Sequence, residues 1–415
     1  MTAGTDELLS LSAEALAAAV RRGEVSAVEI TETFLRRIDE HAGGHAFITT
    51  CPERALERAA RRPSGPLAGV PLAVKDMFDT AGLRTTYGSA IFADHVPTRT
   101  ASAVRQLEAA GAIVVGKANQ HEFAWGVTSQ NPHWGTVANP VRPGRVAGGS
   151  SGGTAAALAD RLCTIGLGTD TGGSVRIPAA CCDVVGFKPP LGAVSTSGTF
   201  PLAPSFDTVG PMARSVRDCA LVYALLAGRA VPPPRLAGVR VGVLEPTGHE
   251  DELTALGALL EEAVLPESQA EGPHAGDPMA VFLAEIAAVH RPWFPRLRDQ
   301  YGPDVQFKLD AAQLVSEREA AQGRIALGEL RRRARTVPAV DLVISPTLAI
   351  EPPPVDCWEP DVRAGMTRYT RPFNFLGWPT IAIGNLQIAG RDERTVLSAA
   401  LAWEEAYGRT AAART

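Results

Sequence analysis

Two glycine-rich segments near the middle of the chain each carry serine. Residues 144–153 read GRVAGGSSGG and include Ser150 and Ser151, and a second segment reads TDTGGS and ends on Ser174. Glycine beside serine lets the backbone approach a substrate closely and leaves N–H groups to face a developing oxyanion. The two segments therefore indicate acyl transfer by a serine nucleophile. Two flexible turns without a chemical role are the alternative, and these residues alone favour neither.

The same glycines do not match the loops that bind nucleotides. A Walker A loop requires lysine before its final Ser or Thr, and neither segment has one there; G-x-G-x-x-G is also missing from both. The nucleophile elbow G-x-S-x-G of α/β-hydrolases is missing at Ser174, which lies in GGSVR. A phosphate-binding loop is therefore disfavoured.

A serine nucleophile needs a base, because its hydroxyl is a weak nucleophile at its free pKa. None of the eight histidines lies in an obvious motif, although triad partners can be distant in sequence. Lys75 offers another route, because it ends the apolar run over 70–74 and burial makes a lysine lose its charge more readily. Neutral lysine is the base in Ser–Lys variants of the triad. A surface lysine at the end of a strand is the alternative.

The elements that must position these residues alternate in the manner of an α/β protein. Residues 70–74 predict a buried strand, residues 101–111 a helix, and residues 112–117 the next strand. Strand, helix and strand in this order favour parallel pairing. Residues 163–168 predict a further strand, which leads into the segment that ends on Ser174.

Further elements are predicted on both sides of this core. Ser26 and Glu29 form a capping-box pattern within a helical stretch over 11–40. The remaining predicted elements are helices over 53–62, 154–160, 216–228 and 394–407, several helices between 253 and 337, and strands over 239–244 and 342–347.

Composition and charge restrict the class of protein. Of 415 residues, 45% are hydrophobic and 20% charged, a globular balance that excludes a disordered chain. The formal net charge is −5, which gives no reason to expect a basic face for nucleic acid or for an anionic membrane. No window of about 18 apolar residues lacks charge, so no transmembrane helix is predicted.

The cysteines and the first residues bear on the compartment. Six cysteines are too few for a disulfide scaffold and none lies at metal-ligand spacing, so we expect reduced, mostly buried thiols and neither a metal nor another cofactor. Residues 1–10 carry acids and have no apolar stretch, so no secretory signal is visible. A cytoplasmic protein is the expectation.

Three segments at fixed spacing, taken together, resemble the amidase signature family. They are GVPLAVKDMFDT around Lys75, AGGSSGGTAAALA around Ser150 and GLGTDTGGSVRIPAA around Ser174. The 75 residues from Lys75 to Ser150 and the 24 residues from Ser150 to Ser174 are the spacing of the lysine and two serines of that family. The resemblance is strong over about residues 60–230 and weak over 245–340.

The resemblance implies a role for each of these residues. Ser174 would be the nucleophile, and Ser150 a bridging serine held by a cis peptide after Gly149. Lys75 would be the base that drives both. The spacing selects Ser150 over its neighbour Ser151. The tetrahedral oxyanion would be held by backbone N–H groups of the second segment, namely those of Thr171, Gly172, Gly173 and Ser174.

Other residues receive weaker assignments from the resemblance. Asp170 would hold the loop through its backbone or through Arg176, or would be a plain turn aspartate. Arg176 would bind a substrate carboxylate bidentately, or would form a structural ion pair. Asp76 would orient Lys75, or would only end the strand.

A predicted acyl pocket comes from the segment HEFAWGVTSQN. The resemblance implies that Trp125, Gly126 and Val127 line this pocket. The bulk of Trp125 would shorten it and favour small or flat substrates. Core packing of Trp125 is the alternative.

The resemblance also implies the architecture. It predicts a single compact α/β domain over residues 1–415, with a central mixed β-sheet covered by helices on both faces. The signature core would occupy about 60–230, and residues 235–415 would be the C-terminal part of the same domain. Near the end, residues 381–388 run almost directly from one strand into the next, so a hairpin that is longer in the family is expected to be trimmed at the substrate mouth.

The expected function is that of an amidohydrolase. It would cleave a small, non-peptide carboxamide through an acyl-enzyme on Ser174, with Ser150 and Lys75 as the relay for protons. A glutaminase-type amidotransferase subunit is the alternative within the family, since HEFAWG followed by Gln130 and Asn131 is similar to its pocket. Ester, carbamate or ureide cleavage and acyl transfer would use the same triad. The expected partner is the small substrate, without nucleic acid or membrane, and a homodimer is compatible with these patterns.

Overall fold

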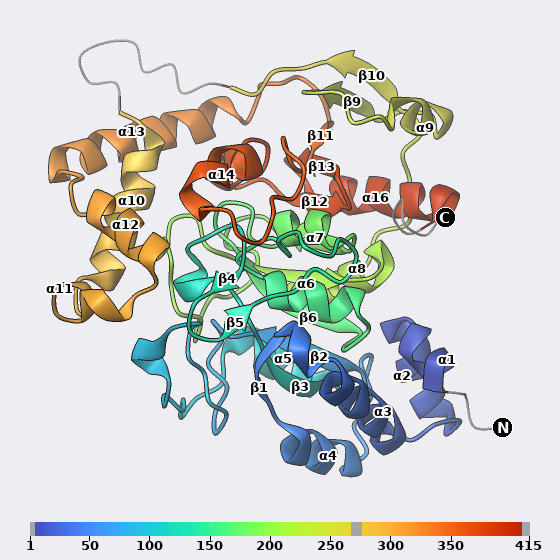
Figure 1. Ribbon diagram of the computed structural model, residues 1–415. Coiled ribbons are helices and arrows are strands. Elements are labelled where there is room, and N and C mark those ends of the chain that lie inside the picture. Colours follow the sequence, from blue (N-terminus) through green and yellow to red (C-terminus); the bar gives the residue numbers. More distant parts are fainter. Residues whose placement is uncertain (1–4, 267–275, 409–415) are drawn as a thin grey trace.

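A single large sheet runs through the molecule. The computed structural model describes residues 5–266 and 276–408. In sheet order, the eleven strands found in these residues are β1 (Phe47–Thr50), β3 (Ile113–Ala118), β2 (Pro71–Lys75), β6 (Ile165–Asp170), β8 (Thr208–Ala213), β7 (Val185–Lys188), β12 (Thr380–Ile383), β13 (Leu386–Gly390), β11 (Leu342–Pro346), β9 (Arg240–Val243) and β10 (Leu259–Glu262) (Figure 1). A separate ribbon pairs β4 (Gln130–Asn131) with β5 (Gly135–Thr136).

Helices surround this sheet. In chain order they are α1 (Thr5–Ser10), α2 (Ala13–Arg22), α3 (Ala27–Glu40), α4 (Pro52–Ala60), α5 (Ser102–Ala109), α6 (Gly152–Ala159), α7 (Arg176–Cys181), α8 (Val216–Ala227), α9 (Glu250–Ala255), α10 (Pro278–His290), α11 (Phe294–Leu297), α12 (Pro303–Ala312), α13 (Glu317–Arg333), α14 (Glu359–Thr367), α15 (Arg371–Leu376) and α16 (Glu393–Tyr407). Short 3₁₀ turns lie at 42–44, 90–92, 122–124 and 298–300.

The predicted parallel core is confirmed. β2 pairs in parallel with β3 on one side and with β6 on the other. β8, β7 and β12 continue the sheet with antiparallel pairs, which makes it mixed, as expected. Every residue of β2, β3 and β6 is buried, which explains why these strands are nearly continuous apolar runs in the sequence.

Helices cover both faces of the sheet, which confirms the predicted fold class. Leu72 and Val74 of β2 belong to the hydrophobic core that includes α3, α5, α8 and α16. Ala73, between them, points to the opposite face and belongs to the core that includes α6 and α7. Successive side chains of a strand alternate in this way because the pleat has a period of two.

The capping box at the start of α3 is confirmed. The Ser26 hydroxyl accepts a hydrogen bond from the Glu29 N–H at 3.1 Å, and the Glu29 carboxylate accepts one from the Ser26 N–H at 2.8 Å. Two backbone donors of the helix terminus are satisfied by this exchange.

The connection between β12 and β13 is a tight hairpin. β12 and β13 pair antiparallel with Ile383 opposite Leu386, so only Gly384 and Asn385 join them. Gly384 has φ +55°, in the left-handed region that favours glycine. The direct run between the two strands that the sequence predicts is thus a two-residue loop; whether the loop is longer in related proteins stays a prediction.

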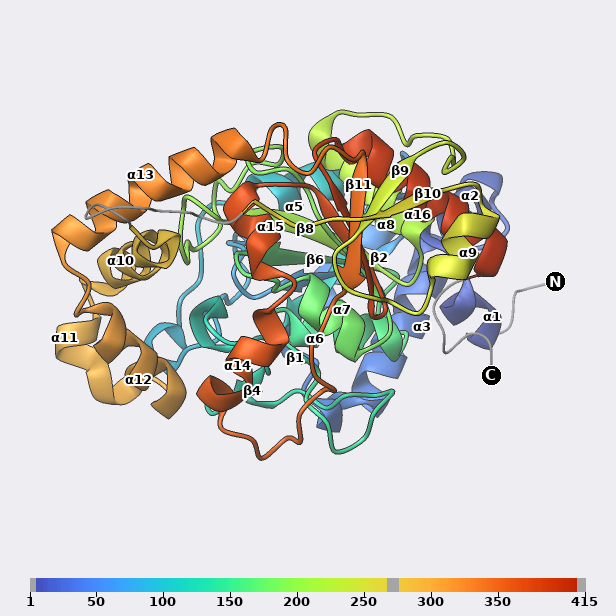
Figure 2. The same cartoon turned by 90° about the horizontal axis from the view of Figure 1, so that it is seen from above.

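α10 to α13 form a helical layer beside the sheet (Figures 1 and 2). Their apolar residues share one core with Phe123, Trp125 and Phe206, which belong to loops of the first half of the chain. The sequence predicted helices in this region without boundaries. In the fold, these helices cover the loops that adjoin the two serine segments.

Two further findings concern cysteine and membranes. All six cysteines are unpaired, and all but Cys357 are buried, as the sequence predicted for reduced thiols. Among residues 5–266 and 276–408, no helix is both long enough and apolar enough to cross a membrane.

Candidate active site

Lys75 is the last residue of β2 and is fully buried. Its Nζ lies 2.6 Å from Ser150 Oγ and 2.8 Å from Thr169 Oγ1. The fold thus brings the predicted lysine and the predicted bridging serine into direct contact, although 75 residues separate them. Sequence reasoning missed Thr169, which lies in β6 beside β2 and supplies a second hydroxyl.

The charge of Lys75 is destabilised by its surroundings. Burial lowers the pKa of Lys75 to about 7, and the negative charges of Asp170 and Asp207 oppose part of this change. No carboxylate forms an ion pair with Lys75 in the described residues. A large share of Lys75 is therefore neutral near pH 7, as a base requires.

The backbone at Gly149 and Ser150 packs closely against residues 121–129. The Gly149–Ser150 peptide bond is cis. The Ser150 carbonyl accepts hydrogen bonds from the His121 N–H at 3.1 Å and the Ser129 hydroxyl at 3.3 Å. Only glycine fits at position 149, because a Cβ there would lie 2.8 Å from the Thr128 nitrogen. The position of the Ser150 hydroxyl is thus fixed by residues on both sides.

Ser174 lies in the turn between β6 and α7 and is 7% exposed. Its carbonyl accepts a hydrogen bond from the Ser151 N–H at 3.1 Å, which ties the two serine segments together. In the described part of the chain, the Ser174 hydroxyl has no hydrogen-bond partner, so the predicted link to Ser150 is not closed here. Catalytic hydrogen bonds often tighten only in the complex with substrate.

Ser151 is directed elsewhere. Its hydroxyl is fully buried and donates to the Thr169 carbonyl at 3.4 Å. A Cβ on Gly168 would lie 2.8 Å from this oxygen, so the serine packs against β6. The spacing argument that selected Ser150 as the bridging serine is compatible with this position.

The backbone N–H groups of the turn do not all remain available. The Asp170 carboxylate accepts a hydrogen bond from the Gly173 N–H at 2.9 Å. Of the four N–H groups predicted to bind the oxyanion, that of Gly173 is therefore already used. Those of Thr171, Gly172 and Ser174 have no acceptor among the described residues. Gly173 has φ +125°, and a Cβ there would lie 2.2 Å from Thr370 Oγ1. Glycine is therefore required at this position for close packing, and not as a hydrogen-bond donor to the oxyanion.

Arg176 is held by protein atoms alone. It is fully buried, and its Nε and Nη2 donate to the Asp170 carboxylate at 3.0 and 2.9 Å. Its other donors reach the Thr370 carbonyl, Gln387 Oε1 and Asn374 Oδ1 at 2.7–2.9 Å. A guanidinium has five N–H donors, and all are used. The predicted role in binding substrate is therefore not available to Arg176, and the structural ion pair is what the fold contains.

Asp170 keeps its charge in spite of its burial. Burial alone would raise the pKa of Asp170, but the charge of Arg176 and hydrogen bonds from Arg176 and Asn374 hold it well below the usual range. The carboxylate accepts from the Gly173 and Val175 N–H groups as well. Asp170 thus organises the turn around the candidate nucleophile, as the resemblance implied.

Side chains of α12 and α14 anchor the backbone of the predicted acyl-pocket residues. Trp125 is 2% exposed and packs in the core beside α10 and α12. Lys308 of α12 donates to the Trp125 carbonyl, and the Val127 N–H donates to Glu359 of α14 at 3.0 Å. A Cβ on Gly126 would lie 2.2 Å from the His121 ring. Bulk at Trp125 therefore contributes to core packing.

Sequence reasoning missed the anchors of this loop. Lys308 bridges Glu359 at 2.9 Å and Asp304 at 2.8 Å, and Asp304 also lies 2.7 Å from the His121 ring. Lys308 and Asp304 come from the segment where the family resemblance is weak, and no local pattern marked them or Glu359. They form a buried network whose members satisfy one another.

Asp76 does not orient Lys75. Its carboxylate lies 3.4 Å from Lys117 Nζ and accepts the Thr86 N–H and hydroxyl at 2.8 and 2.6 Å. The alternative of a residue that supports the strand end therefore fits better. Among the described residues, no cluster of three or more His, Cys, Asp or Glu side chains is arranged to hold a metal.

The family model and the curated relatives match this chain over part of its length. A family model described as Amidase matches residues 29–251. A glutamyl-tRNA(Gln) amidotransferase subunit of Methylococcus capsulatus is 40% identical over 62% of this chain and 61% of the relative, and the corresponding protein of Thermus thermophilus is 49% identical over 52% and 46%. The chain thus spans less than two thirds of the length of these curated relatives.

Solved structures match nearly the whole chain. An amidase is 31% identical, covers 95% of this chain and 99% of its own, and has a TM-score of 0.85. 6-Aminohexanoate cyclic dimer hydrolase complexed with substrate is 27% identical, with coverage of 96% and 97% and a TM-score of 0.85. A peptide amidase from Stenotrophomonas maltophilia is 26% identical, with coverage of 97% and 98% and a TM-score of 0.80.

The Arg176–Asp170 pair generates a prediction on stability. Arg176→Met leaves a buried carboxylate without its counter-ion, so we expect the free energy of unfolding to fall by about 3–5 kcal/mol. Urea denaturation followed by circular dichroism measures this. Arg217→Met is the control, because Arg217 pairs with Glu405 at the surface, where about half of each side chain is exposed; its expected cost is at most about 1 kcal/mol. Equal small losses for the two variants would contradict a structural role for Arg176.

Proposed function

Because the chain belongs to the amidase family, we propose that it hydrolyses the carboxamide bond of small molecules through an acyl-enzyme on Ser174. The observation that carries this proposal is the 2.6 Å contact between Lys75 Nζ and Ser150 Oγ. It joins a buried amine of lowered pKa to a hydroxyl beside the turn that holds Ser174. This arrangement supplies a base at neutral pH without histidine.

The proposed reaction begins with proton transfer. Neutral Lys75 accepts the Ser150 proton, Ser150 accepts the Ser174 proton, and Ser174 Oγ attacks the carbonyl carbon. The N–H groups of Thr171, Gly172 and Ser174 face the oxyanion of the tetrahedral intermediate. The lysine then returns its proton through Ser150 to the leaving amine, and the C–N bond breaks. Water attacks the acyl-enzyme along the reverse proton path, which releases the acid.

Thr169 gives Lys75 a fixed orientation in this scheme. A neutral amine has two N–H donors and one lone pair. One donor binds Thr169 Oγ1 at 2.8 Å, which helps to direct the lone pair at Ser150. This positioning needs no charged partner, so it does not return Lys75 to its protonated form.

A second candidate is the glutaminase part of an amidotransferase. It is favoured by the curated relatives, which are glutamyl-tRNA(Gln) amidotransferase subunits. Ammonia release from glutamine, compared with release from simple alkanamides, separates the two candidates. Esters, carbamates and ureides belong in the same panel, because the triad is suited to all of them.

The role of Ser174 generates a prediction on labelling. A fluorophosphonate should form one adduct, on Ser174, detected by peptide mass spectrometry. Ser174→Ala should lose both the adduct and amide turnover, because no acyl-enzyme forms. Ser151→Ala is the matched control and should keep the adduct, since the Ser151 hydroxyl packs against β6. Labelling of Ser151, or normal turnover by Ser174→Ala, would reject the assignment.

The pKa of Lys75 generates a prediction on pH. kcat/KM for a neutral amide should rise with pH and level off above about pH 7, because Lys75 must be unprotonated and its pKa is lowered to about 7. The measurement is a pH–rate profile between pH 5 and 9 in a buffer series of constant ionic strength.

Two variants test the same base. Lys75→Met should lower kcat by roughly 10²–10⁴-fold through loss of base catalysis. Lys75→Arg should be no better, because a guanidinium stays protonated. If Lys75→Arg kept near-normal turnover, the site would need a positive charge and not a base, and the proton relay would be wrong.

A further inference from the structure

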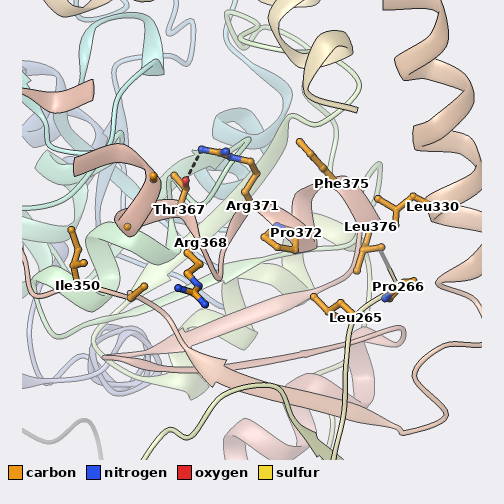
Figure 3. A pocket seen from close by; sticks show the side chains of 13 residues that line it. Leu265, Pro266, Leu330, Ile350, Thr367, Arg368, Arg371, Pro372, Phe375 and Leu376 are labelled. Atoms are coloured by element: carbon orange, nitrogen blue, oxygen red, sulfur yellow. Dashed lines mark hydrogen bonds between the residues drawn. The ribbon is translucent and has the colours of Figure 1, made fainter. Parts of the chain in front are cut away.

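A pocket lies between α13, α14, α15 and residues Leu265 and Pro266, which follow β10 (Figure 3). Its volume is about 570 Å³, within the range of about 300–1,000 Å³ that is typical of small-molecule sites. Most of the lining is apolar and includes Leu265, Leu330, Ile350 and Phe375. A ligand for this pocket therefore has an apolar body.

Arg371, the first residue of α15, is a partly buried cation in the wall of this pocket. Among the described residues its guanidinium makes one hydrogen bond, to the hydroxyl of Thr367 at 2.5 Å (Figure 3). No described carboxylate lies within ion-pair distance of it. Since guanidinium has five N–H donors, most remain to bind an anion.

The other arginines near this site are paired. All donors of Arg176 are held by protein acceptors, including the Asp170 carboxylate. Arg368, also in the pocket wall, is 64% exposed and lies 3.7 Å from the Glu245 carboxylate. A guanidinium in an apolar wall without a counter-ion is costly for the fold unless a ligand supplies the negative charge.

The electrostatic surroundings of Arg371 agree with this unpaired state. Burial lowers the pKa of Arg371 to about 10, and the charge of Arg363 acts in the same direction. Asp277 and Glu359 oppose this change from a distance. Glu359 is already bound to Lys308 and Arg363. Arg371 is therefore cationic at neutral pH, and no carboxylate of residues 5–266 and 276–408 pairs with it.

The wall that carries Arg371 also contacts the catalytic turn. Thr370, directly before Arg371, donates its hydroxyl to the Gly172 carbonyl at 2.8 Å. One helical turn after Arg371, the Phe375 ring lies 5.2 Å from that of Phe206. The residue directly before Arg371 and a residue one helical turn after it therefore both contact segments that flank the candidate nucleophile or its turn.

We propose that Arg371 binds a carboxylate carried by the substrate, so that the preferred substrates are amides with a free acid group separated from the scissile amide by an apolar chain. This inference rests on the proposed amidase function and specifies its substrate class. Bidentate binding of a carboxylate matches the planar guanidinium, and the apolar lining accommodates the chain.

A substrate series tests the inference. Half-amides of linear dicarboxylic acids, with two to six methylenes, are compared with alkanamides of equal chain length, and ammonia release gives kcat and KM. We expect kcat/KM for the best half-amide to exceed that of its alkanamide about 10- to 100-fold, the range of a hydrogen-bonded charge pair. The difference should lie mainly in KM.

Variants locate the effect. Arg371→Gln should reduce the ratio of kcat/KM for the half-amide to kcat/KM for the alkanamide to near one. Arg371→Lys should keep part of this preference, because the lysine amine keeps the charge but loses the bidentate geometry. Arg368→Gln is the matched control, with the same change of charge in the same wall, and should reduce the ratio less than twofold. Thermal unfolding and fluorophosphonate labelling of Ser174 check that each variant is folded.

The outcomes separate this inference from the proposed function. If alkanamides are cleaved as well as half-amides, or if Arg368→Gln lowers the ratio as much as Arg371→Gln, the inference is wrong and the amidase function stands. If no amide releases ammonia, the proposed function fails. In that case calorimetry with a linear dicarboxylic acid still tests Arg371. Binding by the parent protein and loss of binding in Arg371→Gln would support the site, and equal binding by both would overturn it.

Discussion

The turn after β6 has its shape because one carboxylate accepts five hydrogen bonds. Asp170 receives two from backbone N–H groups, two from Arg176 and one from Asn374. An ionised carboxylate without solvent contact is stable only when its charge and lone pairs are satisfied in this way. Arg176 in turn donates to Asn374 of α15 and to Gln387 of β13. The turn that carries Ser174 is therefore complete only when the C-terminal part of the chain is packed against it.

Burial lowers the pKa of Lys75, Lys117 and Lys188, but the partners of the three amines differ. Lys117 has a carboxylate, Asp76, at 3.4 Å. Lys188 is fully buried with a pKa lowered to about 7, like Lys75, yet its amine contacts only the Pro189 carbonyl, which has no proton to exchange. Lys75 faces two hydroxyls. Of Lys75 and Lys188, whose pKa values are both lowered to about 7, only Lys75 thus contacts hydroxyl groups in the described part of the chain.

The second half of the chain contributes by holding backbone in place. Lys308 and Glu359 bind the Trp125 carbonyl and the Val127 N–H, and the loop between these groups encloses Gly149. Charged side chains fix this loop because backbone groups in the interior must be paired.

Features that depend on local pattern or on residue spacing could be predicted from the sequence. They are the capping box at Ser26, the parallel core around β2 and the selection of Lys75, Ser150 and Ser174 as candidate catalytic residues, which rests on three contiguous segments at fixed spacing. The strands β7 and β8 were not recognised, because their glycine and proline obscure the apolar pattern. The fold was needed to show that the Gly173 N–H is bound by Asp170, that every donor of Arg176 is used and that, among the residues the structure describes, no carboxylate pairs with Arg371. The reason is distance along the chain: Arg176 and Gln387 are 211 residues apart, and no local pattern specifies which acceptors the fold brings to a buried cation.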